Sequence, residues 1–387
     1  MTRDFDIIVF GATSFVGKLT AQYLAREHGD LKIALAGRNW AKLQDLQLPF
    51  PLLKADAANK TELDDLAKKT KVIISTVGPY TRYGDFLVDA CAKNDTHYVD
   101  LCGEALFIRR VIDRWHGKTD AKIVHSCGFD SVPSDMGMFH LWLKSGRKEF
   151  SEVVMSVDKL QGGLSGGTVD SMREVSRDAK RMPKGGAILH SPYTLSPDHT
   201  QEPDLGEQPD FTARYVPLIK QWAGPFFMSM FNTRVVRRSN TLSGYRYGRA
   251  LRYSEVTPTG EGLAGKLKAK ALLGAVGAAF SAIMVDKLRK PLSAVVPEPG
   301  EGPTKLDDGG FTITHHGQAL DGSYHSARVS AEGDPGYKVT AMMLGEAAVV
   351  LATSPAGLPE ETGILTPATG LGEPYLKALR AVGMYFS

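Results

Sequence analysis

A glycine-containing loop between an apolar run and a helical pattern constrains the fold of this chain more than any other feature. Residues 5–10 (Phe-Asp-Ile-Ile-Val-Phe) are β-rich, and Gly11-Ala-Thr-Ser-Phe-Val-Gly17 follows them directly. Gly11 permits a tight strand-to-helix turn, and Gly17 lets the helix pack closely on the strand. Backbone N–H groups at the start of such a helix point toward a bound phosphate. The loop predicts a dinucleotide-binding unit, and an ordinary glycine-rich turn is the alternative.

Strand-like and helix-like segments alternate from residue 5 to about residue 127. The strand-like segments are residues 5–10, 31–36, 50–55, 72–76, 97–101 and 122–126. Short β-rich runs separated by helices are typical of a parallel sheet with right-handed crossovers. We therefore predict an α/β fold in which residues 1–130 form a Rossmann-type doubly wound parallel sheet with strand order 3-2-1-4-5-6.

The pattern changes after Gly128. Strand-like segments at 153–158, 245–256, 311–316 and 325–331 are separated by long connections rich in glycine and proline, notably 162–167, 197–209 and 297–310. We predict a second, α+β domain in residues 131–336 that closes over the nucleotide and shapes a substrate pocket. Helical patterns return at 337–353 and 374–384. Residues 337–387 can therefore pack back onto the first domain.

Charge and cysteine content exclude several kinds of partner. The net charge of +3 is small and no arginine-rich block is present, so we expect no nucleic acid. Cys91, Cys102 and Cys127 have no C-x-x-C spacing, which fits a reducing compartment without a disulfide framework. No signal-peptide pattern precedes the first strand, so a cytoplasmic location is the default expectation.

The end of the second strand distinguishes between the two nicotinamide cofactors. NAD-binding domains usually place Asp or Glu there to accept a hydrogen bond from the ribose 2′-hydroxyl. This chain has Gly37-Arg38-Asn39 instead, and an arginine pairs well with a 2′-phosphate. We therefore predict NADP(H). Asp56, just past the third strand, is a candidate acceptor for the adenine amino group or, alternatively, a solvated capping aspartate.

The remaining cofactor contacts are expected from two loops. Ser14 stands where the middle glycine of the loop is usual, and its small hydroxyl side chain can donate to a phosphate. Small residues after the fourth strand allow the ribose and nicotinamide to approach the backbone. The predicted contacts from these loops are Gly11, Thr13, Ser14, Phe15, Val16, Gly17, Thr76, Val77 and Gly78.

Polar clusters follow the fifth and sixth strands, where a doubly wound fold places its ligand. They span residues 100–104 and 125–135. The candidates for proton transfer are Tyr80, Glu104, Asp130 and Asp135, each with a structural role as the alternative. No tyrosine is followed by lysine four residues later, and no G-x-S-x-G or Walker loop is present. Hydride transfer involving the nicotinamide remains as the predicted chemistry.

A zinc site built from Cys102, His125 and Cys127 is conceivable at the same strand ends. The spacing of these residues matches no standard ligand signature. We therefore predict no metal.

Several motifs together resemble the saccharopine dehydrogenase-like oxidoreductases, and within them the trans-acting enoyl reductases of mycobacterial-type lipid synthesis. They are Gly11–Gly17, Ala36-Gly-Arg38, Val77-Gly-Pro-Tyr80, Tyr98–Glu104, Gly128–Asp135, Gly333-Asp-Pro-Gly-Tyr337 and Gly363–Ala368. The resemblance spans almost the whole chain. It implies an NADP-binding domain, a second domain that shapes the substrate pocket, and a reductase acting on an enoyl or keto group of a lipid-type acyl substrate.

Two other functions stay open. The first is a saccharopine-type amino-acid dehydrogenase, although the chain lacks an evident arginine cluster for several carboxylates. The second is a non-enzymatic nucleotide-binding protein associated with lipid or membrane. A homo-oligomer is also compatible with the sequence.

An uncharged segment at 271–285 supports a connection to lipid. Basic residues flank it at Lys266, Lys268 and Lys270 and again at Lys287, Arg289 and Lys290. It is shorter than the roughly 20 apolar residues of a membrane span. It can be an interfacial segment that meets anionic headgroups, or a buried helix or oligomer interface. A second apolar stretch, 217–230, is a candidate lining for an acyl pocket. It includes Trp222, Phe226 and Phe227, and Phe231 lies just beyond it.

Overall fold

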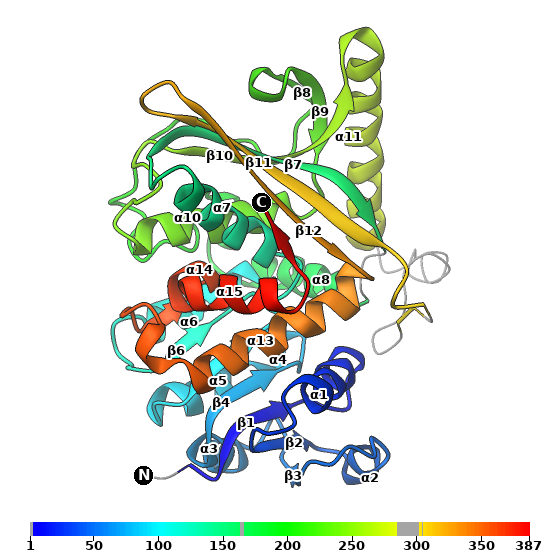
Figure 1. Cartoon of the computed structure of the whole chain (residues 1–387), viewed down its shortest axis with the longest axis vertical. Helices are drawn as coiled ribbons and strands as arrows, with labels where there is room; N and C mark the ends of the chain where they lie inside the picture. The colour runs from blue at the N-terminus through cyan, green and yellow to red at the C-terminus, as the bar shows by residue number, and fades with distance from the viewer. Residues whose placement is uncertain (1–2, 163–165, 285–301, 304) are drawn as a thin grey trace.

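The computed structural model describes residues 3–162, 166–284, 302–303 and 305–387, which are organised around two sheets. In Figure 1 the parallel sheet occupies the lower half of the molecule, and the second sheet lies above it beside the long helix α11. Part of the predicted glycine-rich stretch 162–167 and much of 297–310 lie outside the described residues.

The first sheet has seven parallel strands in the order β13-β6-β5-β4-β1-β2-β3. This confirms the predicted Rossmann-type order and adds one strand, β13, beyond β6. The strands are β1 (Phe5–Phe10), β2 (Ile33–Gly37), β3 (Leu52–Lys54), β4 (Thr70–Ser75), β5 (His97–Asp100), β6 (Lys122–Val124) and β13 (Gly363–Leu365).

Alternate side chains of β1 enter two different cores, which is why helices cover both faces of the sheet. Ile7 and Val9 pack in a cluster with α1 and α13, whereas Ile8 and Phe10 pack in a cluster with α3, α5 and α6. The helices of these two layers are α1 (Phe15–Glu27), α2 (Trp40–Gln44), α3 (Lys60–Lys69), α4 (Tyr80–Tyr83), α5 (Asp85–Lys93), α6 (Ala105–Trp115) and α13 (Thr340–Thr353).

The C-terminal segment contacts both sheets. Buried Glu346 of α13 accepts a hydrogen bond from the Tyr23 hydroxyl at 2.6 Å and lies 2.6 Å from His28 Nε2, both at the end of α1. β14 (Tyr385–Phe386) pairs with a strand of the second sheet. The remaining C-terminal elements are the 3₁₀-helix Pro355–Gly357 and the helices α14 (Pro367–Gly370) and α15 (Gly372–Ala381).

The second sheet is mixed, with the order β14-β12-β11-β7-β10-β9-β8. Within this sheet the β7–β10 pair is parallel, and the other described strand pairs are antiparallel. Besides β14, its strands are β7 (Phe150–Gln161), β8 (Arg214–Val216), β9 (Gln221–Pro225), β10 (Arg252–Gly260), β11 (Gly310–Ala319) and β12 (Tyr324–Glu332).

The predicted strand at 245–256 is wrong in its first half. Gly244, Tyr245 and Gly248 all have positive φ, and the Tyr245 N–H donates to Asn240 O. The chain therefore turns there before β10 begins at Arg252.

Helices of the second domain lie below and beside this sheet in the view of Figure 1, and several of them contact its strands. They are α7 (Val132–Lys144), α8 (Gly166–Arg181), α9 (Gly185–His190), α10 (Ser229–Leu242) and α11 (Gly262–Met284), with a 3₁₀-turn at Pro217–Ile219 and a π-turn at Pro335–Val339. Most of the segment predicted at 271–285 belongs to α11, and Val285 and the basic residues after it lie outside the described residues. None of the described helices is long and apolar enough to cross a membrane.

Candidate cofactor and substrate site

The turn between β1 and α1 requires glycine at two positions. Gly11 has φ +86°, and a Cβ added there would lie 2.7 Å from Val77 Cγ2. A Cβ added at Gly17 would overlap the Gly11 carbonyl oxygen. The open cradle at the first turn of α1, where the N–H groups lack intrahelical acceptors, fits a pyrophosphate.

Ser14 has a structural task in this turn. Its Oγ accepts a hydrogen bond from Gly17 N–H at 3.0 Å, which caps α1. Its hydroxyl donates to Thr76 Oγ1 at 3.0 Å, and Thr76 donates in turn to Gly11 O at 2.9 Å. The two predicted cofactor loops are therefore held together by hydroxyl groups.

Arg38 and Asp56 lie at the same edge of the sheet as the loop. Gly11 N–H donates to Ala36 O at 2.9 Å, so the loop contacts the end of β2. Arg38 lies two residues beyond Ala36 in the chain and is exposed. No ion pair to Arg38 is formed within the described part of the chain, which leaves its guanidinium available to a phosphate. Asp56 accepts a hydrogen bond from Ala58 N–H at 2.9 Å in the turn before α3. This contact occupies one carboxylate oxygen and supports the alternative that Asp56 has a structural role.

A cavity of about 1060 Å³ runs from these loops toward the second sheet. At one end it is lined by Ser14, Phe15 and Val16 together with Thr76 and Gly78. Neither Arg38 nor Asp56 belongs to its lining. Helices α8, α9, α10 and α11 provide a large part of the other walls, so the cavity lies between the dinucleotide loops and the second domain.

The end of the cavity far from the loops is aromatic. Phe280 of α11 stacks on Phe227 with ring centroids 4.8 Å apart and meets the edge of Phe211 at 6.1 Å. Phe227, Met228, Met230 and Phe231 line the cavity, whereas Trp222 of β9 does not. Several residues toward the end of the predicted apolar stretch therefore line this wall, and Phe226 does not.

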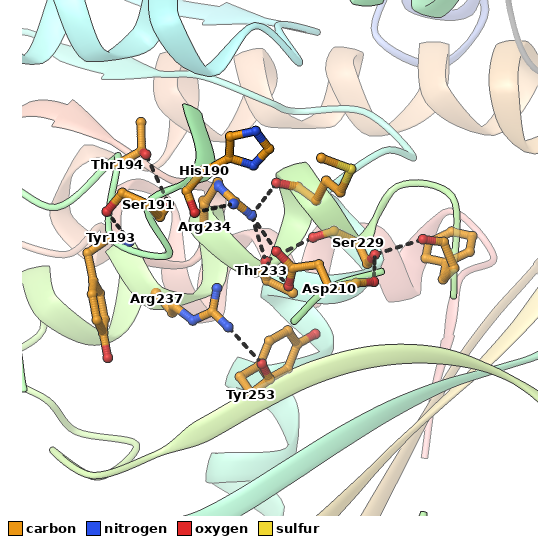
Figure 2. A network of polar contacts seen from close by, with 12 residues as sticks. His190, Ser191, Tyr193, Thr194, Asp210, Ser229, Thr233, Arg234, Arg237 and Tyr253 are labelled. Carbon is orange, nitrogen blue, oxygen red and sulfur yellow. Dashed lines mark hydrogen bonds and ion pairs between the residues drawn. The ribbon is translucent and has the colours of Figure 1, made fainter. Parts of the chain in front are cut away.

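A buried ion pair also belongs to the cavity lining, and Figure 2 shows the polar contacts around it. Arg234 Nη1 lies 2.6 Å from Asp210 Oδ2, and the Thr233 hydroxyl donates to the other carboxylate oxygen at 2.9 Å. Arg234 also donates to the His190 carbonyl, while Arg237 points away and donates to Tyr253 O. Because Asp210 neutralises Arg234, this arginine is not available as a free cation to a carboxylate substrate.

Tyr80 is buried, and its hydroxyl has two backbone partners. It donates to Ser75 O at 3.0 Å and accepts from Leu101 N–H at 3.2 Å, which ties the end of β4 to the end of β5. Burial raises its pKa well above 10. Its ring contributes to the cavity wall, but its proton is committed to the backbone.

Glu104 and Asp135 are fully buried and hold elements together. Glu104 accepts from the N–H groups of Tyr80 at 2.8 Å and Thr81 at 2.7 Å, and from the Ser171 hydroxyl at 2.9 Å. Asp135 accepts from Ala368 N–H and from the Ser239 hydroxyl. Burial raises the pKa of both carboxyls, and neither lines the cavity.

Asp130 differs from the other candidates because it lines the cavity. It follows Gly128 and Phe129, which also line the cavity at the end of β6. Burial raises its pKa to about 6, so the carboxyl is partly protonated near neutral pH. Of the four candidates, Asp130 alone combines a place on the cavity wall with a pKa suited to proton transfer.

His125 and the nearby cysteines are core residues. His125 Nδ1 lies 2.7 Å from Asp100 Oδ2, and Asp100 also accepts from the N–H groups of Cys102 and Ser126 at 3.0 Å. Within the described residues no group of three or more His, Cys, Asp or Glu side chains is placed to hold a metal ion.

Sequence reasoning missed the contribution of α8. This helix lines the cavity and is fixed to the first domain by ion pairs of 2.6 Å from Glu174 to Arg82 and from Asp178 to Arg110. No short motif marks these residues. Tyr337 was also missed: it lines the cavity and its ring meets Phe15 of the glycine loop edge-on at 4.9 Å. It lies in the Gly333–Tyr337 motif, which was a signal for it.

Comparison with known proteins agrees with this geometry. Residues 7–121 match the saccharopine dehydrogenase NADP binding domain. An apo saccharopine dehydrogenase (L-Glu forming) of Saccharomyces cerevisiae has the same fold, with a TM-score of 0.52 and 12% identity over 99% of both chains. The chain is thus an NADP-dependent oxidoreductase with a saccharopine dehydrogenase-like fold.

Full-length relatives narrow this class. A putative trans-acting enoyl reductase of Mycobacterium tuberculosis is 41% identical over 99% of this chain and 97% of its own length. A trans-acting enoyl reductase of Mycobacterium ulcerans is 38% identical over 100% of this chain and 98% of its own. The chain belongs to the trans-acting enoyl reductase family.

Proposed function

We propose that this protein uses NADPH to reduce an enoyl or keto group of an apolar, lipid-type acyl substrate. The observation that carries the proposal is the cavity itself, which starts at the dinucleotide loops and ends among Phe211, Phe227 and Phe280. An acyl chain in this aromatic region would lie in line with a reacting group beside the loops. Apolar chains gain binding free energy roughly in proportion to the area they bury.

The charges around the cavity favour this substrate over an amino acid with several carboxylates. Among the described residues, the charged side chains in its lining are Asp130, Asp170, Asp210, Lys180 and Arg234. Arg234 is already paired with Asp210. Asp170 lies 3.7 Å from Arg173, and the acid form of Asp130 is neutral, so the charges in the lining nearly cancel. Such a lining offers too few cations for a saccharopine-like substrate with several carboxylates.

The residues around the reacting group divide into two roles. When bound, NADPH supplies the hydride, and the glycine loop and the first turn of α1 hold its pyrophosphate. Asp130 would deliver the proton, and its position in the cavity lining supports this role. Tyr80 and Glu104 position the loop at Gly78, because their polar groups bond the backbone on both sides of it.

The test follows NADPH absorbance with enoyl and keto acyl thioesters of increasing chain length, and with saccharopine as the competitor substrate. Wild-type kcat/KM should rise with chain length. Gly277→Leu should lower kcat/KM for the longest chain at least tenfold and spare the shortest, because Gly277 lines the cavity and a Cβ added there would lie 3.8 Å from the Phe211 ring. Gly274→Leu is the matched control, one turn away on the exposed side of α11. Turnover of saccharopine alone would refute the proposal.

A further inference from the structure

Helix α11 has an outer face that contacts no other part of the described chain. Leu263 and Leu267 are 71% and 60% exposed. Ala271, Gly274 and Ala278 continue the same line at helical spacing and are also exposed. We call these five residues the outer stripe. From its first to its last residue the stripe is about 22 Å long at 1.5 Å per residue.

The charged residues of α11 are all basic. Within 262–284 the sequence contains Lys266, Lys268 and Lys270 and no acidic residue. At 100° per residue, the exposed Lys268 and Lys270 lie on opposite edges of the stripe, next to Leu267 and Ala271. An apolar line bordered by lysines is complementary to a surface that is apolar within and anionic at its rim.

The inner face of the same helix forms the substrate cavity. Gly277 and Phe280 line the cavity, and Ala269 is buried against the sheet. One helix thickness, about 10 Å, therefore separates the apolar end of the cavity from the outer stripe. A lipid surface on the stripe would bring apolar substrates next to the wall of the pocket.

We propose that the outer stripe of α11 rests on an anionic lipid membrane. Pairing of two copies through the stripe is less favourable, since each helix would bring Lys268 and Lys270, and no carboxylate from 262–284, to the other. Lipid phosphates supply the missing negative charge to the lysines near the surface. The helix lies in the interface rather than crossing it. This proposal concerns where the protein binds and does not depend on which group it reduces.

Vesicle flotation of the full chain tests the proposal. Vesicles of phosphatidylcholine with phosphatidylglycerol should carry the wild-type protein upward, and vesicles of phosphatidylcholine alone should carry at least tenfold less. Leu263→Glu/Leu267→Glu should lower binding at least tenfold, and so should the uncharged pair Leu263→Ser/Leu267→Ser. The matched control is Leu160→Glu/Leu320→Glu, which makes the same charge change at leucines that are 43% and 61% exposed elsewhere. This control should bind like the wild type.

Three results would overturn the proposal. The first is a wild-type protein that floats with neither kind of vesicle. The second is an equal loss in the stripe and control variants, which would show that charge alone matters. The third is a wild-type dimer in sedimentation velocity that the stripe variants convert to a monomer, without vesicle binding, which would assign the stripe to a second copy. Circular dichroism should show unchanged thermal unfolding in every variant, since all four leucines are exposed.

Discussion

Replacement of Glu104 by glutamine separates a positioning role from a catalytic one. The carboxylate accepts hydrogen bonds from the N–H groups of Tyr80 and Thr81, one on each oxygen. In Glu104→Gln one oxygen becomes NH₂ and faces an N–H donor. Losing a charge-assisted bond costs about 1.5–3 kcal/mol, and the stranded N–H adds to this cost. The neutral amide regains part of the penalty for burying a charge, which leaves a destabilisation of about 2 kcal/mol.

Urea denaturation measures this change, and steady-state kinetics with NADPH measures turnover. We expect Glu104→Gln to shift the unfolding midpoint by the equivalent of about 2 kcal/mol and to lower kcat less than tenfold. Glu149→Gln is the matched control, because Glu149 is exposed and should stay within about 0.5 kcal/mol of wild type. Unchanged stability together with a thousandfold loss of kcat would refute the positioning role and make Glu104 the proton donor.

Further variants test the cofactor loop and the proposed acid. Gly17→Ala should lower NADPH affinity at least a hundredfold in calorimetry, because its Cβ overlaps Gly11 O; unchanged affinity would contradict the loop assignment. Arg38→Ala should cut the preference for NADPH over NADH about tenfold, the effect of one exposed charge-assisted contact; an unchanged ratio would contradict it. Wild-type kcat/KM should fall as pH rises through about 6, the pKa of Asp130, because the acid form donates the proton. Asp130→Asn should abolish this pH dependence. A pH profile that survives the substitution would exclude Asp130 as the proton donor.

The raised pKa of Asp130 also has a consequence for stability. The folded carboxyl holds its proton up to about pH 6, whereas the unfolded one releases it near about pH 4. The contribution of this group to stability is therefore present below about pH 4 and is lost as pH rises to about 6. Thermal unfolding of Asp130→Asn should lack this part of the pH dependence. An identical pH dependence in wild type and variant would contradict the assigned pKa.

The first sheet could be predicted because its physical signals are local. Alternation of apolar runs with helical patterns and the glycines of the first turn indicated the strand order that β1 to β6 adopt. β13 could not be found this way, since three apolar residues at Gly363–Leu365 form a strand only through pairing with β6. The turn at Tyr245 was missed although Gly244 and Gly248 mark it in the sequence, because the apolar and aromatic residues around them resemble a strand.

The site was predictable on its cofactor side and much less so on its substrate side. Ser14 and Thr76 are far apart in sequence, but both follow recognisable strands that the fold makes neighbours. Phe211, Phe227 and Phe280 come from a loop, a strand end and a long helix, and no spacing relates them. The catalytic assignments were limited for the same reason. Asp130 lines the cavity and Glu104 is bonded to the backbone away from it, and this difference appears only in the folded structure.

The chain-length dependence of NADPH oxidation tests the central claim most directly. Purified protein would be given NADPH and enoyl thioesters from short to long acyl chains, with Gly277→Leu and Gly274→Leu in parallel. The account predicts that kcat/KM increases with chain length in wild type and Gly274→Leu, and that Gly277→Leu removes the increase. An enzyme that consumes NADPH equally with every chain length, or only with a dicarboxylic amino acid, would contradict an acyl pocket in the cavity.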